Sequence, residues 1–261
     1  MTETVRSMTD VAPTIAALLG LPGPSASVGS ALRPVVDDLG RPRGVAVLAP
    51  DAFGLFAWSL WKAEMPYLLS LHERRSLVLR SVMPSITPVN FAAMVTGTDV
   101  EGHGVRSFSD PFACETLFDV VRSAGGRSAA VGLAGYTGSE LLGRHADLWG
   151  RVETMTDDAI VDRTLEIAEA NGPDFLIVQL GRVDDVFHEH GPSSPAVLPM
   201  VRGTDARLER LVSTLRPLGY ASIILADHGQ HDVEHPVEGG HRGDHGTSSD
   251  EDCLVPCTWA S

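Results

Sequence analysis

Short apolar runs rich in β-branched residues recur along the chain and alternate with longer stretches of helical periodicity. We expect the apolar runs to be strands buried on both faces, at 44–49, 76–82, 128–132, 174–180, 220–226 and 253–258. Helices are expected at 55–71, 88–97, 114–124, 156–170 and 195–216, several of them ending at glycine. The alternation predicts a three-layer α/β fold, in which an open, mostly parallel sheet carries helices on both faces.

Polar side chains directly follow several of these strands. They are Asp51 after the first strand, Thr87 just past the second, Asp184 after the fourth, and Asp227 and His228 at the end of the fifth. In open α/β sheets the loops and helix N-termini converge beyond the carboxyl ends of the strands, where ligands bind. These residues are therefore expected to meet at one edge of the sheet.

Carboxylates and imidazoles concentrate in the stretch from Asp184 to His245, which holds seven of the ten histidines. Asp184 and His188 are four residues apart and share one helical face, so they can bind one ion, although a surface Asp-His pair has the same spacing. Asp227 and His228 end an apolar strand, where buried polar groups need a partner; the alternative is a strand-end turn. Together these side chains indicate bound divalent metal, with zinc favoured and manganese or iron as alternatives.

The segment 84–105 places a hydroxyl at a junction between a loop and a helix. Thr87 precedes Pro88, the expected first helical residue, and the backbone N–H groups of this helix end can receive a phosphate oxygen. On local pattern alone, Thr87 is as well suited to capping the helix as to catalysis.

Composition and charge narrow the class of protein. The 261 residues, 43% hydrophobic and 21% charged, are typical of a globular chain, and the formal charge of −14 argues against a nucleic-acid polymer or an anionic membrane as partner. We expect a cytoplasmic protein, because the chain has no long apolar run and no basic segment before an apolar stretch at its start. Its three cysteines are expected to be reduced.

Four motifs in order resemble the type I phosphodiesterase/nucleotide pyrophosphatases of the alkaline phosphatase superfamily. The segment PSITPVNFAAMVTGTDVEGHGV resembles that family's nucleophile region. DDVFHEHGPS resembles its metal-binding D-x-x-G-H segment, ADHG its S-D-H-G, and GDHG its final histidine segment. The resemblance covers about 44–258, and Asp51 after GVAVLAP matches the first metal aspartate, with Asp-Ala in place of the usual Asp-Gly.

The resemblance implies two divalent metal ions and a threonine nucleophile. Asp184, His188 and His245 would hold one ion. The other would be held by Asp51, Asp227 and His228, with Thr87 beside it. Two such ions can stabilise the attacking and leaving oxygens of an in-line displacement at phosphorus, through an intermediate on the threonine.

Several neighbouring residues compete for these roles or support them. Asp185 could replace Asp184, and His241 could replace His245, although the family spacing favours Asp184. We expect His190, His231, His235 and His241 to be loop residues or hydrogen-bond partners. His103, in a Gly-His-Gly turn, is expected to orient the nucleophile loop.

The sequence departs from the family in its substrate-binding features. Asn90 is the only nearby candidate for the family's phosphate-binding asparagine. Only 17 residues separate His228 from His245, where many relatives insert a cap domain. Substrate selection is therefore expected to rest on short loops, such as 98–112, 133–155 and 229–243. Candidate aromatic contacts for a base are Phe53, Phe108, Phe112 and Tyr136.

The order of the segments suggests a circular permutation within a single catalytic domain spanning 1–261. Residues 7–31 resemble the segment that normally follows the last metal histidine, so 1–43 is expected to be the permuted C-terminal part of the family fold. An unrelated N-terminal helix is the alternative. Permutation is plausible physically because domain termini often lie close together.

The function predicted from these features is a metal-dependent phosphoester hydrolase, a phosphodiesterase or nucleotide pyrophosphatase acting on a small phosphoester. Alternatives within the superfamily are a phosphomonoesterase, a phosphonate hydrolase or a mutase. Sulfatases and the mutases that use serine fit Thr87 less well. An alternative of another class is a metal- or phosphoester-binding module without catalysis. The oligomeric state is left open, with a homodimer among the options.

Overall fold

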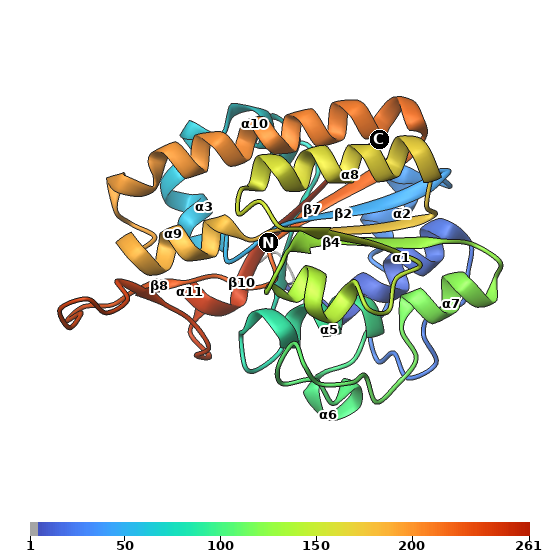
Figure 1. Cartoon of the computed structure of the whole chain (residues 1–261), viewed down its shortest axis with the longest axis horizontal. Helices are drawn as coiled ribbons and strands as arrows, with labels where there is room; N and C mark the ends of the chain where they lie inside the picture. Colours follow the sequence, from blue (N-terminus) through green and yellow to red (C-terminus); the bar gives the residue numbers. More distant parts are fainter. Residues whose placement is uncertain (1–4) are drawn as a thin grey trace.

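The computed structural model describes residues 5–261 and contains an eight-stranded mixed sheet (Figure 1). The strand order is β1-β3-β10-β7-β2-β6-β4-β5. All pairs are parallel except those of β10, which is antiparallel to both neighbours. The strands are β1 (Arg6–Ser7), β2 (Gly44–Pro50), β3 (Ser76–Arg80), β4 (Ser128–Leu133), β5 (Leu148–Val152), β6 (Phe175–Leu180), β7 (Tyr220–Leu225) and β10 (Leu254–Ala260).

The central strands β2, β6 and β7 are buried along their whole length, as their continuous apolar sequences predict. Val45 lies opposite Phe175 and Pro50 opposite Leu180, while Leu48 lies opposite Ile224 of β7. This register brings the carboxyl ends of the three strands together. The loops that follow them therefore start side by side at one edge of the sheet.

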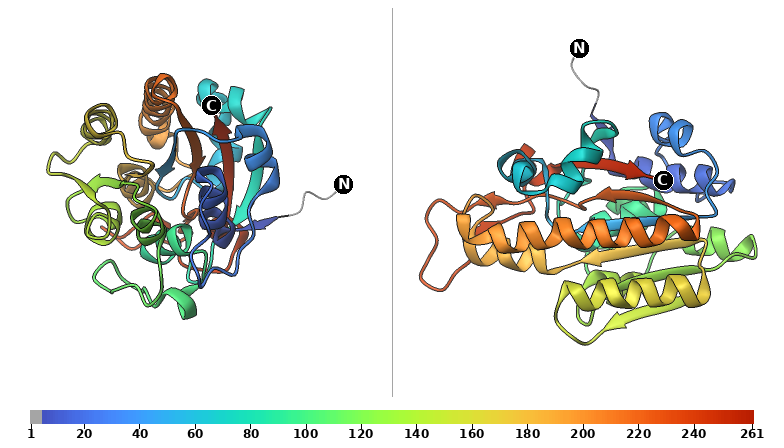
Figure 2. Two further views of the ribbon diagram at one scale, coloured as in Figure 1. Left: turned by 90° about the vertical axis from the view of Figure 1, so that its right-hand side faces the viewer. Right: turned by 90° about the horizontal axis from the view of Figure 1, so that it is seen from above.

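Helices cover both faces of the sheet (Figures 1 and 2). One face carries α3 (Leu55–Trp61), α4 (Pro66–His72), α8 (Asp157–Asn171) and α10 (Leu198–Leu215). The other carries α1 (Val11–Leu19), α2 (Arg33–Leu39), α5 (Thr87–Thr96) and α7 (Leu117–Ser123). The predicted fold class is confirmed.

Shorter elements complete the carboxyl edge of the sheet. Helix α9 (Arg182–His190) directly follows β6 and contacts a two-stranded hairpin made of β8 (His231–Asp232) and β9 (Gly243–Asp244). Helix α11 (Asp250–Cys253) leads into β10, and α6 (Val100–His103) follows α5.

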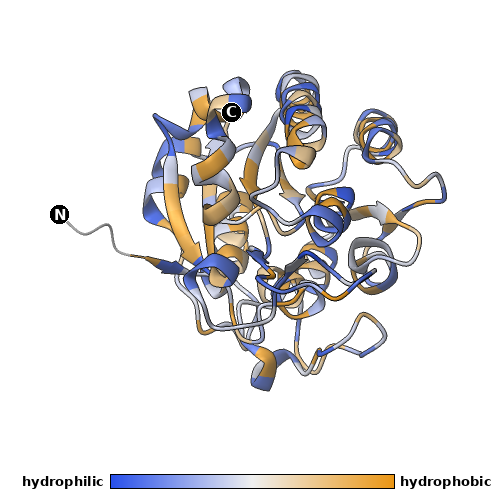
Figure 3. Cartoon of the chain, turned by 90° about the vertical axis from the view of Figure 1, so that its left-hand side faces the viewer, coloured by the Kyte–Doolittle hydropathy of each residue, from blue (hydrophilic) through white to orange (hydrophobic). Residues whose placement is uncertain are grey.

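The hydrophobic core lies between the sheet and its helices, and Figure 3 shows apolar residues along the strands and the inner faces of the helices. Phe118 and Phe175 pack with ring centroids 5.6 Å apart between α7 and the sheet. Phe53 and Phe187 pack 5.9 Å apart under α9. The second pair anchors the helix that carries two of the candidate metal ligands.

The observed elements differ from the predicted ones mainly at prolines within predicted helices and at the edge strands of the sheet. The helix predicted at 55–71 is two helices, because Pro66 cannot continue α3 and instead begins α4. The helix predicted at 195–216 is α10 preceded by a 3-10 turn at Pro195–Val197. Strands β1, β5, β8 and β9 and helices α2, α6 and α11 had not been predicted. Helix α9 had been expected only as the helical turn that carries Asp184 and His188.

The N-terminal segment lies beside the strand that neighbours β10. β1 pairs with β3, which in turn pairs with β10, and α1 packs against α5 and α2. The permuted order of the segments stays a prediction. Within residues 5–261, no helix combines the length and the apolar character that a membrane span requires.

Candidate active site

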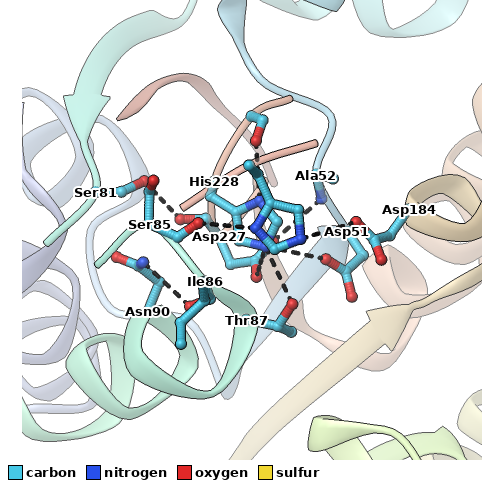
Figure 4. Close-up of polar contacts among 12 residues, drawn as sticks. Asp51, Ala52, Ser81, Ser85, Ile86, Thr87, Asn90, Asp184, Asp227 and His228 are labelled. Carbon is cyan, nitrogen blue, oxygen red and sulfur yellow. Dashed lines mark hydrogen bonds and ion pairs between the residues drawn. The ribbon is translucent and has the colours of Figure 1, made fainter. Parts of the chain in front are cut away.

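All seven side chains predicted to form the site lie at the carboxyl edge of the sheet. Their elements are those expected from the strand ends: the β2 and β7 ends, the start of α5, the face of α9, and the segment after β9. Figure 4 shows Asp51, Thr87, Asp184 and Asp227 around the imidazole of His228. The side chains are Asp51, Thr87, Asp184, His188, Asp227, His228 and His245.

Asp51, Asp227 and His228 form a buried group at the ends of β2 and β7. The Nε2 atom of His228 lies 3.2 Å from Oδ2 of Asp227 and 3.7 Å from Oδ1 of Asp51. Those two carboxylate oxygens are buried and have no hydrogen-bond donor. A pair of uncompensated carboxylate oxygens facing one imidazole is the arrangement that a divalent cation would complete.

Burial and mutual repulsion perturb both carboxyl groups. Burial, followed by the charges of Asp227 and Asp184, raises the pKa of Asp51 well above its ordinary value. Burial likewise raises the pKa of Asp227, although the imidazole of His228 opposes the shift. In the absence of a cation, the two groups therefore resist ionisation at neutral pH.

Asp184 lies between two further imidazoles. Its Oδ2 atom is 3.4 Å from Nε2 of His188, and its Oδ1 atom is 3.7 Å from Nε2 of His245. Burial opposes ionisation of Asp184, but the hydrogen bond with His188 and the nearby imidazoles lower its pKa. Burial and then the charge of His228 lower the pKa of His245 to about 4, which favours the neutral form that binds metal.

The three imidazoles are oriented by backbone carbonyl oxygens. Nδ1 of His188 lies 2.8 Å from the oxygen of Gly243, Nδ1 of His228 lies 3.0 Å from that of Gly229, and Nδ1 of His245 lies 3.0 Å from that of Ser85. A carbonyl oxygen can only accept, so each Nδ1 donates, and a neutral ring then has its Nε2 lone pair free. Burial lowers the pKa of His188, but the hydrogen bond and charge of Asp184 outweigh it and raise that pKa, so in the absence of metal the His188 Nε2 can also carry a proton for Asp184. Each Nε2 faces a carboxylate of the site, as a metal ligand oriented by its surroundings would.

Three groups of side chains lie close enough together to bind one ion each, and two of these groups have His228 in common. Ligand atoms of Asp51, Asp227 and His228 lie within 4.8 Å of one another, and so do those of Asp184, His228 and His245. His188 forms a third such group with His241 and Asp244 on the exposed side. His228 thus belongs to both buried groups and lies between the two implied ion sites. His188 contacts Asp184 and also lies near His241 and Asp244 of the hairpin segment.

Thr87 points into the site from the first turn of α5. Its Oγ1 atom lies 3.0 Å from Nε2 of His228. The N-cap of α5 is Ile86, and no side chain caps the helix. The alternative in which Thr87 serves as a cap is therefore not what the structure shows. The helix starts at Thr87 itself, with Pro88 as its second residue.

Asp185 and His241 have other partners. Asp185 accepts hydrogen bonds from Tyr136 Oη at 2.5 Å and from Arg182 at 2.6 Å. His241 is exposed and stacks on His188 with ring centroids 4.3 Å apart. The geometry accordingly favours Asp184 and His245 for the buried positions.

The remaining histidines occupy the surroundings of the site. His231 lies 2.8 Å from a carboxylate oxygen of the buried Asp252. His190 lies on α9 beside Glu189, and His235 is exposed in the hairpin loop. His103 is buried, and its Nδ1 accepts from the N–H of Val105.

Asn90 is enclosed and organises the loop before Thr87. Its Oδ1 accepts from the N–H of Val82 at 2.8 Å, and its amide nitrogen contacts the carbonyl oxygens of Val82, Pro84 and Ile86. The side chain is fully buried. Contact with a phosphate would require breaking these bonds, so the structure gives Asn90 a role in shaping the nucleophile loop.

Two buried glutamines orient the carboxylates and were missed in the sequence. Gln179 donates to Oδ2 of Asp51, and its own oxygen accepts from the N–H of Gly138. Gln230 donates to Oδ1 of Asp184. In each case the glutamine engages one carboxylate oxygen, as residues that position metal ligands do. A signal was present for Gln179, because it interrupts the apolar strand FLIVQL.

The turn after β2 contains Ala52, the alanine that stands where the family pattern has glycine. Ala52 has a left-handed conformation with φ of 60°, which favours glycine, and its N–H donates to Asp227 at 3.2 Å. Gly54 and Gly229 pack together so closely that a Cβ on Gly54 would lie 2.5 Å from the Cα of Gly229. These backbone features bring the Asp51 and Asp227 loops into contact.

The mostly parallel sheet with helices on both faces is the fold of the alkaline phosphatase superfamily. Residues 111–241 match the model of the type I phosphodiesterase / nucleotide pyrophosphatase family. This match spans half of the chain, and the chain belongs to that family. No curated protein matches the chain.

Solved structures with the same fold share little sequence with this chain. Phosphonoacetate hydrolase from Sinorhizobium meliloti 1021, in complex with phosphonoformate, is 21% identical with a TM-score of 0.58, over 77% of this chain and 59% of that one. Murine ectonucleotide pyrophosphatase / phosphodiesterase 5 is 15% identical with a TM-score of 0.66, over 82% and 87%. An inactive threonine-to-alanine form of the murine protein in complex with AMP has a TM-score of 0.63 at 15% identity. The chain thus spans less than two thirds of the length of the bacterial hydrolase.

Proposed function

We propose that this protein is a metal-dependent phosphoester hydrolase, a phosphodiesterase or nucleotide pyrophosphatase that uses Thr87 as nucleophile and two divalent cations. The observation that carries the proposal is the position of the Thr87 hydroxyl, 3.0 Å from Nε2 of His228. The same Nε2 faces two buried carboxylate oxygens that lack donors. The proposed nucleophile therefore lies directly beside the proposed cation site, at the carboxyl edge of the sheet.

The donor set fits two divalent cations. Asp51, Asp227 and His228 would hold one, with the Thr87 oxygen as a further ligand. Asp184, His188 and His245 would hold the other. Carboxylate oxygens with neutral imidazoles suit zinc, and manganese or iron accept the same donors. When bound, the cations would neutralise the carboxylates and stabilise charge on the attacking and leaving oxygens.

The residues of the chain then account for the reaction. Thr87 Oγ1 attacks phosphorus in line with the leaving oxygen, and its proton is lost to solvent. The bond to the leaving oxygen breaks, and that oxygen keeps the electron pair and takes up a proton. Water then hydrolyses the phosphothreonyl group, which restores the hydroxyl. Asn90 holds the loop before Thr87, so the hydroxyl keeps its position through both steps.

Two of the comparisons support the proposal. The family model names phosphodiesterase and nucleotide pyrophosphatase activities. The inactive form of the murine protein carries alanine in place of a threonine and binds AMP, which agrees with a small phosphoester substrate and an essential threonine here.

The proposal is tested by comparing two chromogenic substrates under controlled metal content. After chelator treatment, the protein is expected to lose turnover of bis(4-nitrophenyl) phosphate and to regain it when zinc or manganese is added. The diester is expected to react faster than 4-nitrophenyl phosphate. Faster turnover of the monoester would favour a phosphomonoesterase. Metal binding with no turnover of either ester would favour a binding module.

A further inference from the structure

A cavity of about 650 Å³ lies directly beside the candidate metal ligands. One wall is the outer face of α9, with Asp185, His188 and Glu189. The other is the β8–β9 hairpin (231–244), which contributes His241 and Arg242. The hairpin projects from the body of the molecule beside α9 (Figure 1). His188 thus faces Asp184 on one side and the cavity on the other.

In-line geometry relates this cavity to the proposed reaction. Thr87 lies against the Asp51, Asp227 and His228 half of the site. In an in-line displacement the leaving group departs on the side of phosphorus opposite to the nucleophile. With phosphorus placed between the two halves of the site, that side would be the half formed by Asp184, His188 and His245, and His188 also lines the cavity. The leaving group would therefore enter the cavity.

The lining of the cavity is suited to an anionic leaving group. No phenylalanine, tyrosine or tryptophan lines the cavity, and its rings are the imidazoles of His188, His190 and His241. It therefore has no phenyl, phenol or indole ring for a nucleobase to stack on. Arg242 contributes a guanidinium, whose planar fork of donors matches a carboxylate or phosphate group. Within residues 5–261, the Arg242 side chain has no ion pair or hydrogen bond.

The acidic side chains that line the cavity do not neutralise the charge of Arg242. Asp185 is held by Tyr136 and by Arg182. The Glu189 side chain is 73% exposed and lies 3.7 Å from His190. The Arg242 backbone is fixed on both sides, because its N–H donates to the oxygen of His188 at 2.7 Å and its oxygen accepts from Val233 at 2.8 Å. The backbone of Arg242 is therefore anchored beside His188 at the wall of the cavity.

We propose that this cavity is the leaving-group pocket and that Arg242 makes the protein specific for phosphoesters whose leaving group carries a second anionic group. The inference rests on the proposed function and narrows its substrate class. Neutral aryl or nucleoside leaving groups could occupy the cavity but would make no ion pair with Arg242.

The test measures equilibrium binding in the full-length, zinc-loaded protein carrying Thr87→Ala, which prevents turnover. The probes are alkylphosphonates with one to three methylene groups, each bearing a terminal carboxylate, methyl or amine. For at least one chain length, calorimetry is expected to show binding of the carboxylate about tenfold or more tighter than the methyl compound, and weakest binding of the amine.

Variants assign the preference to Arg242. Arg242→Gln is expected to remove most of the carboxylate preference while leaving the affinity for the methyl compounds unchanged, and Arg242→Lys should retain part of it. The control is Arg74→Gln, which removes an exposed arginine from the loop before β3, at the opposite edge of the sheet; it should change nothing.

Two results would overturn the inference while leaving the proposed hydrolase intact. One is equal binding of carboxylate and methyl compounds at every length, and the other is a carboxylate preference that persists in Arg242→Gln. If no phosphonate binds at all, the proposed phosphoester site itself is contradicted, and the pocket assignment with it.

Discussion

Replacing Thr87 with alanine is expected to lower turnover of a phosphodiester by about 10³-fold or more, which is the scale seen when a catalytic nucleophile is removed. The physical reason is that Thr87 is the hydroxyl that lies against His228 at the candidate cation site. The loss should appear in kcat. Zinc content should stay close to that of the wild type, because six nitrogen and oxygen ligands remain.

Two further variants separate chemistry from folding. Thr87→Ser keeps a hydroxyl at the same place and should recover part of the activity. Thr96→Ala removes another threonine of α5, whose hydroxyl bonds to the oxygen of Ala92 at 2.7 Å, and should reduce stability modestly with activity retained. Wild-type activity in Thr87→Ala would refute the assignment of the nucleophile.

Replacing Asp227 with asparagine is expected to change stability in opposite directions with and without metal. Burial raises the pKa of Asp227 in the folded protein, so at neutral pH the folded state resists an ionisation that the unfolded chain undergoes near pH 3.9. The metal-free variant should therefore be more stable than the metal-free wild type at pH 7, by on the order of 1–3 kcal/mol. This advantage should shrink as the pH falls toward 4, where the carboxyl group is protonated in both states.

In the presence of zinc, the wild type is expected to be more stable than Asp227→Asn. Wild type gains about 4 kcal/mol when the free ion is at a thousand times its dissociation constant, and a shift of roughly 2–4 °C per kcal/mol is expected for a chain of this size. Asp227→Asn should gain much less, because it has lost an anionic ligand. Thermal denaturation with and without chelator measures both effects.

A matched aspartate provides the control for that experiment. Asp205 accepts from the N–H groups of Tyr67 and Leu68 at the start of α4, far from the metal ligands in the fold. Asp205→Asn should change stability by the same amount with and without zinc. An Asp227→Asn variant that behaves in the same way would show that Asp227 has a structural role only.

The sequence predicts the fold well where burial is continuous. All six apolar runs became strands of the sheet. Five of them are buried along nearly their whole length and have no polar face to obscure the pattern, whereas β3 is half-buried. Strand β5 was missed because it is an edge strand with exposed Trp149 and Arg151 between its buried residues. Helix α9 is short and polar; Val183 and Phe187 are its buried residues, and Val186 packs partly against the core.

The site could be assembled from the sequence because strand ends locate residues independently of their distance in the chain. The same rule says nothing about the orientation of amide side chains. Asn90 therefore looked like a phosphate ligand, although it bonds to its own loop. The role of Arg242 was not visible either, because it depends on how the β8–β9 hairpin is anchored to α9.

The central claim is that the carboxyl edge of the sheet holds two divalent cations beside Thr87. Crystals of the zinc-loaded protein, measured at the zinc absorption edge, test it most directly. We expect two anomalous peaks, one among Asp51, Asp227 and His228 and the other among Asp184, His188 and His245. A single peak at the exposed group of His188, His241 and Asp244, or no peak at the carboxyl edge, would contradict the two-metal site.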